Sequence, residues 1–153
     1  MKRSNSTQEF WLEFCRLNLE VDPTEQFQVW YFGDGPELAD QLCDLVLSGT
    51  KTATAALVWE AEADPVTAPV IGGCSVVTNF AGAPRCVIRT TDIQIIPFDE
   101  VPADFAFDEG EGDRSLEYWR KAHWDYFTKR CRELGNVSDT RMPIICERFE
   151  LLS

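Results

Sequence analysis

The sequence offers few ligands for a structural metal. Histidine occurs once, at position 123, and the six cysteines stand one at a time, without a CxxC pair. A structural zinc site takes four cysteine or histidine ligands, usually in closely spaced pairs, so this pattern argues against zinc. Most of the cysteines lie in apolar stretches, which predicts buried free thiols. The six are Cys15, Cys43, Cys74, Cys86, Cys131 and Cys146.

Long apolar runs are also missing. No segment approaches the roughly 18 apolar residues of a membrane-spanning helix, and no apolar core follows the basic residues near the N-terminus, as a secretory signal would require. A chain of 153 residues suits one domain of ordinary size. We therefore expect a cytoplasmic protein without membrane contact. The expected single domain covers residues 1–153, with its core at 27–152 and a first helix at 7–18 packed on it.

Basic residues are in the minority. The chain has 14 Lys and Arg against 26 Asp and Glu, a formal net charge of −12. This charge repels polyanions and weighs against tight, phosphate-dominated binding to long nucleic acid. The charges are also segregated, because residues 114–132 are rich in Lys and Arg while residues 104–113 hold five carboxylates. Two solvated faces of opposite sign, or an anion-binding strip beside an acidic lip, would both explain this distribution.

The spacing of apolar residues predicts both helices and strands. Apolar residues recur at helical intervals in three segments, 7–17, 36–48 and 114–134. Alternating or β-branched runs predict strands at 28–32, 52–59, 75–80, 86–98 and 143–151. Between them, residues 61–73 read as a loop rich in acids, proline and glycine. We expect an α+β fold, a barrel of about five or six mostly antiparallel strands with flanking helices, because this order does not suit repeated βαβ units.

Several residues mark the expected helix ends. Pro36 suits a first helical position, Gly49 and Gly135 suit the positions just past a helix, and Asp113 suits the N-cap of the last helix. His123 falls on the apolar stripe of that helix. We therefore predict that His123 is a packed core residue, with a role as acid or base the alternative.

Residues 49–54, Gly-Thr-Lys-Thr-Ala-Thr, concentrate the polar chemistry of the chain. A lysine here follows a helix end and leads into a strand through hydroxyl-bearing residues. Such a lysine also complements the helix dipole, and threonines are ordinary strand residues, so the segment alone does not require a chemical role. In a straight strand Lys51 and Thr54 would face opposite sides, so they can cooperate only if the backbone bends between them.

The pattern Gly49-x-Lys51-x-x-Thr54 resembles the GxKxxT signature of ASCH domains, whose barrel is related to the PUA fold of RNA-modifying enzymes. Longer segments are similar, in the same order, to bacterial ASCH proteins of comparable length. They are YFGDGPELADQLCDLVLSGTKTATAAL, GAPRCVIRTTDIQIIPFDEV, FDEGEGDRSLEYWRKAHWDYF and MPIICERFELL. The resemblance covers most of the chain from Tyr31 onward and implies a cleft at the barrel mouth, walled by the GxKxxT segment.

Members of this family have been assigned either ribonuclease activity or amide hydrolysis of N4-acetylcytidine. In the amidohydrolase members the catalytic set is a lysine and a threonine of the motif and a later glutamate. The resemblance places these roles on Lys51, Thr54 and Glu109, with Glu111 the alternative glutamate. The set would work if Lys51, partly desolvated, gave up a proton and activated the Thr54 hydroxyl as a base, while the glutamate held the lysine or relayed the proton.

The ribonuclease hypothesis assigns the groups differently. Lys51 would stabilise the charge of the phosphorane, and Arg114, Ser115 and Arg120 at the start of the long helix would orient phosphate oxygens. Carboxylates in residues 108–113 could ligate Mg²⁺ or Mn²⁺, but they lack EF-hand spacing, so we expect no cofactor and no resident metal.

Further substrate-binding candidates surround these groups. A nucleobase pocket needs an aromatic wall, and we expect Tyr31 or Trp59 to supply it, with Thr52 and Glu111 as polar contacts. We expect a hydrolase whose partner is single-stranded RNA or a modified nucleoside. Cleavage of single-stranded RNA is the first hypothesis, and removal of the acyl group of N4-acetylcytidine is the second. A non-catalytic RNA-binding module and a protein-interaction domain remain as alternatives, and the oligomeric state stays open.

Overall fold

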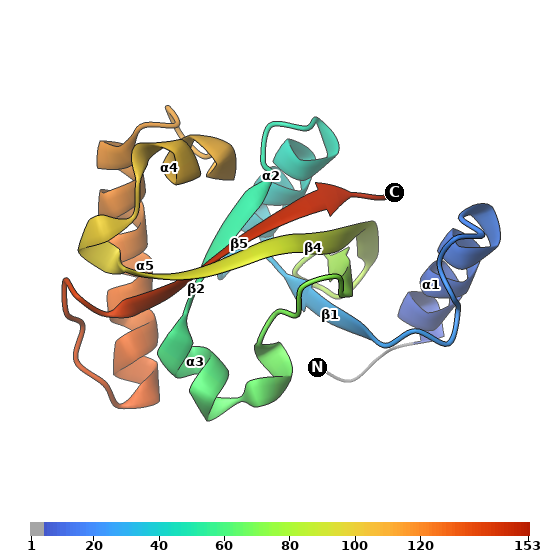
Figure 1. Cartoon of the computed structure of the whole chain (residues 1–153), viewed down its shortest axis with the longest axis horizontal. Coiled ribbons are helices and arrows are strands. Elements are labelled where there is room, and N and C mark those ends of the chain that lie inside the picture. Colours follow the sequence, from blue (N-terminus) through green and yellow to red (C-terminus); the bar gives the residue numbers. More distant parts are fainter. Residues whose placement is uncertain (1–4) are drawn as a thin grey trace.

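The computed structural model describes residues 5–153, so Met1–Ser4, which include the two basic residues of the N-terminal segment, lie outside it. Figure 1 shows the strands at the centre, with α4 and α5 on one side and α1 on the opposite side. The α-helices are α1 (Asn5–Leu17), α2 (Pro36–Leu47), α3 (Val58–Ala63), α4 (Ala103–Glu109) and α5 (Leu116–Leu134). The strands are β1 (Phe27–Tyr31), β2 (Ala53–Leu57), β3 (Cys74–Thr78), β4 (Pro84–Pro97) and β5 (Pro143–Leu151). Two short 3-10 helices are η1 (Pro65–Thr67) and η2 (Phe98–Glu100).

The five strands form one mixed sheet in the order β1-β3-β4-β5-β2. β1 pairs with β3 in parallel, and the other neighbours pair antiparallel. The prediction of an α+β fold with mostly antiparallel strands is therefore confirmed, with five strands in a curled half-barrel (Figure 1).

The long strand β4 joins the two halves of the sheet. Its first part pairs with β3 and most of its length pairs with β5, with a shift of register between Thr90 and Asp92. An extra residue of this kind bends a strand and increases its twist. The bend curls the sheet, so that the strands surround a hollow rather than lie flat.

Three buried clusters hold the helices on the sheet. One joins α4 and α5 to β2 and β5 around Trp119 and Phe127, a second joins α1 to β1, β3 and β4 around Trp11, and a third joins α2 to β1, β3, β4 and β5. The expected first helix begins at Asn5 and buries Trp11 completely. All six cysteines are buried and free, as predicted.

The helix ends show where the sequence was interpreted correctly and where it was not. Pro36 opens α2 and Gly49, at φ +82°, lies just past its end. The N-cap of α5 is Ser115, which accepts a hydrogen bond from the Tyr118 amide, and not Asp113 as predicted. Asp113 instead accepts from the Ser115 amide, because an Asx turn leads into the helix.

One predicted element was too long, and two α-helices were not predicted. The strand expected at 52–59 ends at Leu57, and α3 begins at Val58 and reaches into the expected loop. No helix was predicted in the acidic segment 104–113, but its first half belongs to the helix α4, which buries Phe105 and Ala106. Within residues 5–153, no helix is both long enough and apolar enough to cross a membrane.

Candidate functional site

Lys51 is buried at the point where α2 gives way to β2. Gly49 turns the chain with its positive φ, and the amides of Thr50 and Lys51 both donate to the Leu45 carbonyl, at 2.9 and 3.0 Å. This compact end points the Lys51 side chain inward, where the residue is only 2% exposed. A buried ammonium is strongly unfavourable unless charged partners surround it.

Two glutamates supply these partners. The Nζ of Lys51 lies 3.0 Å from Oε1 of Glu109 and 2.9 Å from Oε2 of Glu111. It also donates weakly to the Glu109 carbonyl, at 3.4 Å, and lies 5.3 Å from the centroid of the Phe32 ring. The sequence left Glu109 and Glu111 as alternatives, and the structure brings both to the same lysine.

The end of α4 packs tightly against the GxKxxT segment. Glu109 is the last residue of α4, and Gly110 follows in the left-handed conformation, at φ +75°. A Cβ at Gly110 would come within 2.7 Å of the Thr50 carbonyl oxygen, so only glycine allows this approach. The Thr52 amide donates to the Asp108 carbonyl at 2.8 Å and fixes the two segments together.

The second carboxylate oxygen of Glu109 is held from α5. The indole Nε1 of Trp119 donates to Oε2, and Nε2 of His123 lies 3.2 Å from the same oxygen. Nδ1 of His123 lies 2.9 Å from the Trp119 carbonyl, and the two rings stack with centroids 4.2 Å apart. Because both ring nitrogens face oxygen acceptors, the geometry suits a doubly protonated imidazole.

The cluster sets the charge of each member. Burial lowers the pKa of Lys51, but Glu109 and Glu111 outweigh it and hold that pKa above its ordinary value. Burial also disfavours the charged forms of Glu109 and His123. Lys51 and His123 nevertheless hold the pKa of Glu109 well below its usual range. Glu109 in turn raises the pKa of His123 above its ordinary value. Burial raises the pKa of Glu111, with Glu109 adding to the shift and Lys51 opposing it.

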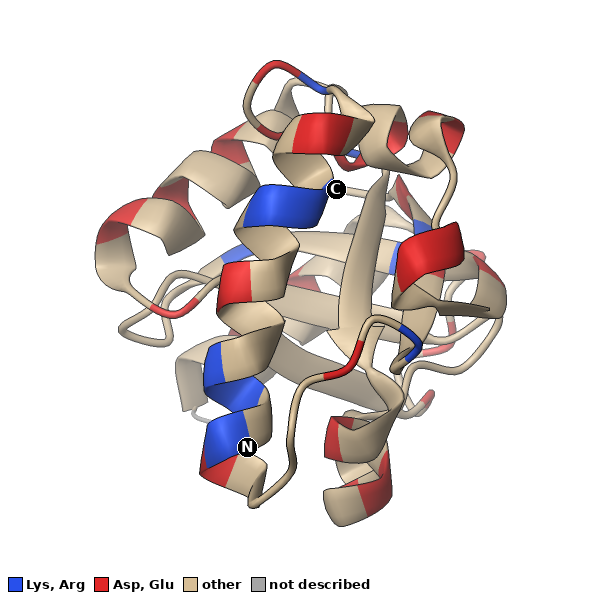
Figure 2. Ribbon diagram, turned by 90° about the vertical axis from the view of Figure 1, so that its left-hand side faces the viewer, with Lys and Arg blue, Asp and Glu red and all other residues tan. Residues whose placement is uncertain are grey.

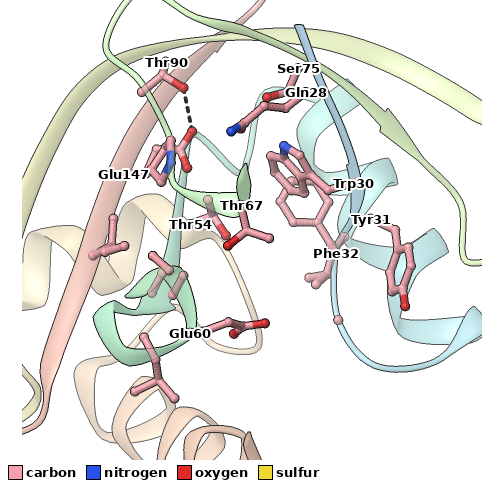
Figure 3. Close-up of a pocket in the computed structure, with 18 of the residues that line it drawn as sticks. Gln28, Trp30, Tyr31, Phe32, Thr54, Glu60, Thr67, Ser75, Thr90 and Glu147 are labelled. Atoms are coloured by element: carbon pink, nitrogen blue, oxygen red, sulfur yellow. Dashed lines mark hydrogen bonds between the residues drawn. The ribbon is translucent and has the colours of Figure 1, made fainter. Parts of the chain in front are cut away.

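This cluster borders a cavity of about 700 Å³, a size typical of small-molecule sites. Its walls include the rings of Trp30, Phe32, Tyr118 and Tyr126. Figure 3 shows Glu147 and Thr54 on one side of the cavity and Trp30 and Phe32 on the other. Among the described residues that line it, Lys51 is the one Lys or Arg, whereas four are glutamates: Glu60, Glu109, Glu111 and Glu147.

Some of the predicted site residues reach this cavity and others do not. Lys51, Thr54, Glu109, Glu111 and Tyr31 line it, although the Tyr31 ring also packs against Phe80, with centroids 5.0 Å apart. Lys51 precedes β2 and Thr54 lies within it, and both side chains reach the cavity although a straight strand would turn them to opposite sides.

Thr52 and Trp59 lie elsewhere. Thr52 is exposed and its hydroxyl faces the Asp108 carbonyl, at 3.4 Å, while Trp59 packs against the buried cluster of α4 and α5. Neither residue is among those that line the cavity. Their roles in substrate binding stay predictions without support from this geometry.

The basic residues near the start of α5 donate hydrogen bonds to backbone carbonyls. Arg114 donates to the Phe107 carbonyl at 2.9 Å and covers the Phe107 ring, and Arg120 donates to the carbonyls of Phe98 and Val101 at 2.8 and 3.1 Å. Ser115 caps the helix. Figure 2 shows blue Lys and Arg segments on the long helix α5, with more of them toward its lower end than in its upper part. None of the three residues lines the cavity, so an anion-binding strip there is not assembled.

Glu109, Glu111 and His123 are also the described residues that could approach one metal ion. One ligand atom from each lies within 4.8 Å of the others. Lys51 already places a positive charge against both carboxylates, and His123 presents N–H groups to the oxygens beside it. The donor set therefore suits an internal ion-pair cluster better than a divalent cation.

Comparisons with known proteins agree with this architecture. A family model described as the ASCH domain matches residues 28–153. The crystal structure of an ASCH domain from Lactobacillus crispatus JV V101 is 32% identical, with a TM-score of 0.85 over 95% of this chain and 93% of that one. Protein EF3133 from Enterococcus faecalis V583 is 29% identical, with a TM-score of 0.84 over 95% of this chain and 89% of that one.

A more distant structure shows the fold alone. Hypothetical protein PH0355 is 12% identical, with a TM-score of 0.57 over 82% of this chain and 99% of that one. No curated protein sequence matches significantly.

Proposed function

The chain belongs to the ASCH domain family, and from this premise we propose that it is a hydrolase that removes the acyl group from the exocyclic amide of a modified nucleoside such as N4-acetylcytidine. ASCH domains are associated with RNA binding, and this nucleoside is a modified component of RNA. The proposal follows the second of the two hypotheses drawn from the sequence.

The charge of the cavity carries this choice. Lys51, the one Lys or Arg among the described residues that line it, is already paired with two carboxylates, and two further glutamates line the walls. Phosphate groups are held in proteins by Arg, Lys or helix N-termini, and here Arg114 and Arg120 donate to backbone carbonyls instead. A neutral ligand with a flat ring therefore suits the cavity better than a phosphate-bearing RNA strand.

The cluster divides the roles of its members. Because Glu109 is ionised and held by Lys51, Trp119 and His123, it acts as the residue that positions Lys51. Lys51 starts as an ammonium and not as the free base first inferred from the sequence, since two carboxylates raise its pKa. Glu111 combines a raised pKa with partial access to the cavity, which suits a group that accepts and returns a proton.

The reaction then proceeds in two halves. Thr54 Oγ1 attacks the amide carbonyl carbon and its proton passes to Glu111, while the Lys51 ammonium stabilises the charge on the carbonyl oxygen. The C–N bond breaks, and the amine leaves with the proton from Glu111. The acyl group stays on Thr54 as an ester. Water hydrolyses this ester, which releases a carboxylic acid and restores the Thr54 hydroxyl.

Product analysis by mass spectrometry tests the reaction. Purified protein is incubated with free N4-acetylcytidine and with a short single-stranded RNA that carries one such residue. Glu111→Gln serves as the active-site variant, and Glu117→Gln, on the exposed side of α5, serves as the control. We expect cytidine and acetate from the free nucleoside, reduced by Glu111→Gln and unchanged by Glu117→Gln.

Other products would point elsewhere. Shorter RNA fragments that depend on Lys51 would establish the ribonuclease hypothesis instead. If neither substrate changed, the result would favour a non-catalytic binding module over a hydrolase.

A further inference from the structure

Each of the five strands contributes one polar side chain to the floor of the cavity, in a row that we call the floor row: Gln28, Ser75, Thr90, Glu147 and Thr54. Gln28 is directly opposite Ser75, and Glu147 is directly opposite Thr54. Thr90 Oγ1 donates to Oε2 of Glu147 at 2.7 Å, as the dashed line in Figure 3 marks. Residues opposite one another share a face of the sheet. Thr90 lies two residues beyond Ile88, which is opposite Ser75, and so is on the same face as Ser75.

Two of these side chains are buried without a full set of partners. Ser75 is 3% exposed, and its hydroxyl makes no hydrogen bond to any residue between 5 and 153. Glu147 is 7% exposed, and Thr90 is its one side-chain partner in that range. Neither polar group is sealed in the core, because the one fully enclosed side-chain nitrogen or oxygen without a partner among the described residues is Thr128 Oγ1. Ser75 and Glu147 line the cavity, so a ligand there can hydrogen-bond to their open polar atoms.

The row presents mainly acceptors to the cavity. Gln28 donates both hydrogens of its Nε2 to the carbonyls of Val66 and Ala68, at 2.9 and 2.7 Å, so its Oε1 remains. Oε1 of Glu147 remains as well, and the Ser75 hydroxyl can donate or accept. Burial raises the pKa of Glu147, against the opposing effects of Thr90 and Lys51.

We infer that Ser75 and Glu147, with Gln28 beside them, form a subsite that binds the ribose hydroxyl groups of the nucleoside. Sugar hydroxyls both donate and accept, which matches two free acceptor oxygens next to one hydroxyl. Phosphate oxygens only accept and carry negative charge, so they do not suit this subsite. The inference rests on the proposed function for the identity of the ligand and adds residues that neither the motif nor the ion-pair cluster contains.

The dimensions agree with one nucleoside. Neighbouring strands lie about 4.8 Å apart, so three spacings from Thr54 to Ser75 span roughly 14 Å along the sheet, less where the sheet curls. An acylated base with its reacting carbon at Thr54 would then place its sugar over Glu147 and Ser75. The row thus orients the amide by holding the opposite end of the ligand.

Calorimetric titration of cytidine, 2′-deoxycytidine and 2′,3′-dideoxycytidine tests the subsite. We expect binding to weaken about tenfold when the hydroxyls are lost, as for a hydrogen bond to a charged or buried group. Ser75→Ala and Glu147→Gln should each weaken cytidine binding and shrink the difference between cytidine and its deoxy analogues. Glu150→Gln, an exposed glutamate on the same strand, is the matched control and should change neither.

The result is independent of the reaction. Equal affinity for the three ligands, variants that weaken all three equally, or no binding of any of them would overturn the subsite. The KM for N4-acetylcytidine and its 2′-deoxy form is measured in parallel. Hydrolysis of both substrates with equal KM values would overturn the subsite and support the proposed reaction. The expected binding pattern without any hydrolysis would support the subsite and overturn the proposed reaction. Because the ligand series is first run on the unaltered protein, a variant that fails to fold does not prevent the test.

Discussion

The ammonium of Lys51 lies 3.0 Å from Oε1 of Glu109, and both side chains are 1% exposed. Glu111 completes the contact on one side and His123 on the other, so that two basic groups face two carboxylates. The four residues come from the segment just before β2, from the end of α4 and the turn after it, and from the middle of α5. Their mutual attraction therefore ties three elements together at the edge of the cavity.

Removing the lysine charge should destabilise the fold. Lys51→Met keeps the length of the side chain but leaves two buried carboxylates without their cation, and we expect a loss of about 3–5 kcal/mol in the free energy of unfolding at pH 7. Lys129→Met is the control, because Lys129 is exposed and its ion pair with Asp34 should contribute less than about 1 kcal/mol. Urea unfolding measures both, and equal effects would contradict a buried cluster.

The approach of α4 to the GxKxxT segment should depend on Gly110. Gly110→Ala forces a left-handed φ on alanine and brings its Cβ against the Thr50 carbonyl, so we expect a loss of about 3 kcal/mol or more. Gly135→Ala has nearly the same φ, +79°, with open space around the Cβ, and should lose about 1–2 kcal/mol. Thermal unfolding of the two variants separates the effect of the Cβ contact with Thr50 from the effect of the left-handed backbone conformation. Similar losses would show that the contact contributes nothing.

His123 should make stability depend on pH. Glu109 raises the pKa of His123 above its ordinary value of about 6.5 despite burial. The stabilisation is therefore fully present below about pH 6.5 and is lost as the pH rises through the folded-state value. The difference in melting temperature between the native chain and His123→Gln should shrink between pH 6 and pH 9. A difference that grows with pH would mean that the folded-state pKa is lowered.

The sequence was sufficient for the motif and the fold class. Gly49, Lys51 and Thr54 could be found because they are close in the chain. The strands could be predicted because polar and apolar residues alternate along them or β-branched residues are frequent in them. The helix α4 was missed because its Asp-Glu-Gly-Glu-Gly ending reads as a loop, although Phe105 and Ala106 anchor it in the core. The choice between Glu109 and Glu111 could not be made, since both reach the same lysine from opposite sides of Gly110.

The floor row could not be predicted at all. Gln28, Ser75, Thr90 and Glu147 lie in four different strands, and the pairing of these strands in the sheet brings them to one cavity. His123 was expected to be a core residue, and it is mostly buried, but its contact with Glu109 crosses from one helix to another. Pairings between distant segments leave no periodic trace in a single sequence.

The central claim is that Thr54 attacks an amide carbonyl next to the Lys51 ammonium. Hydrolysis of free N4-acetylcytidine, followed by chromatography of the cytidine released, should be compared for Thr54→Ser and Thr54→Val. Serine keeps the hydroxyl and should retain most of the activity, whereas valine keeps the shape and should lower kcat/KM by on the order of a thousandfold or more. Undiminished hydrolysis by Thr54→Val would contradict the account, because no nucleophile would then remain at this position.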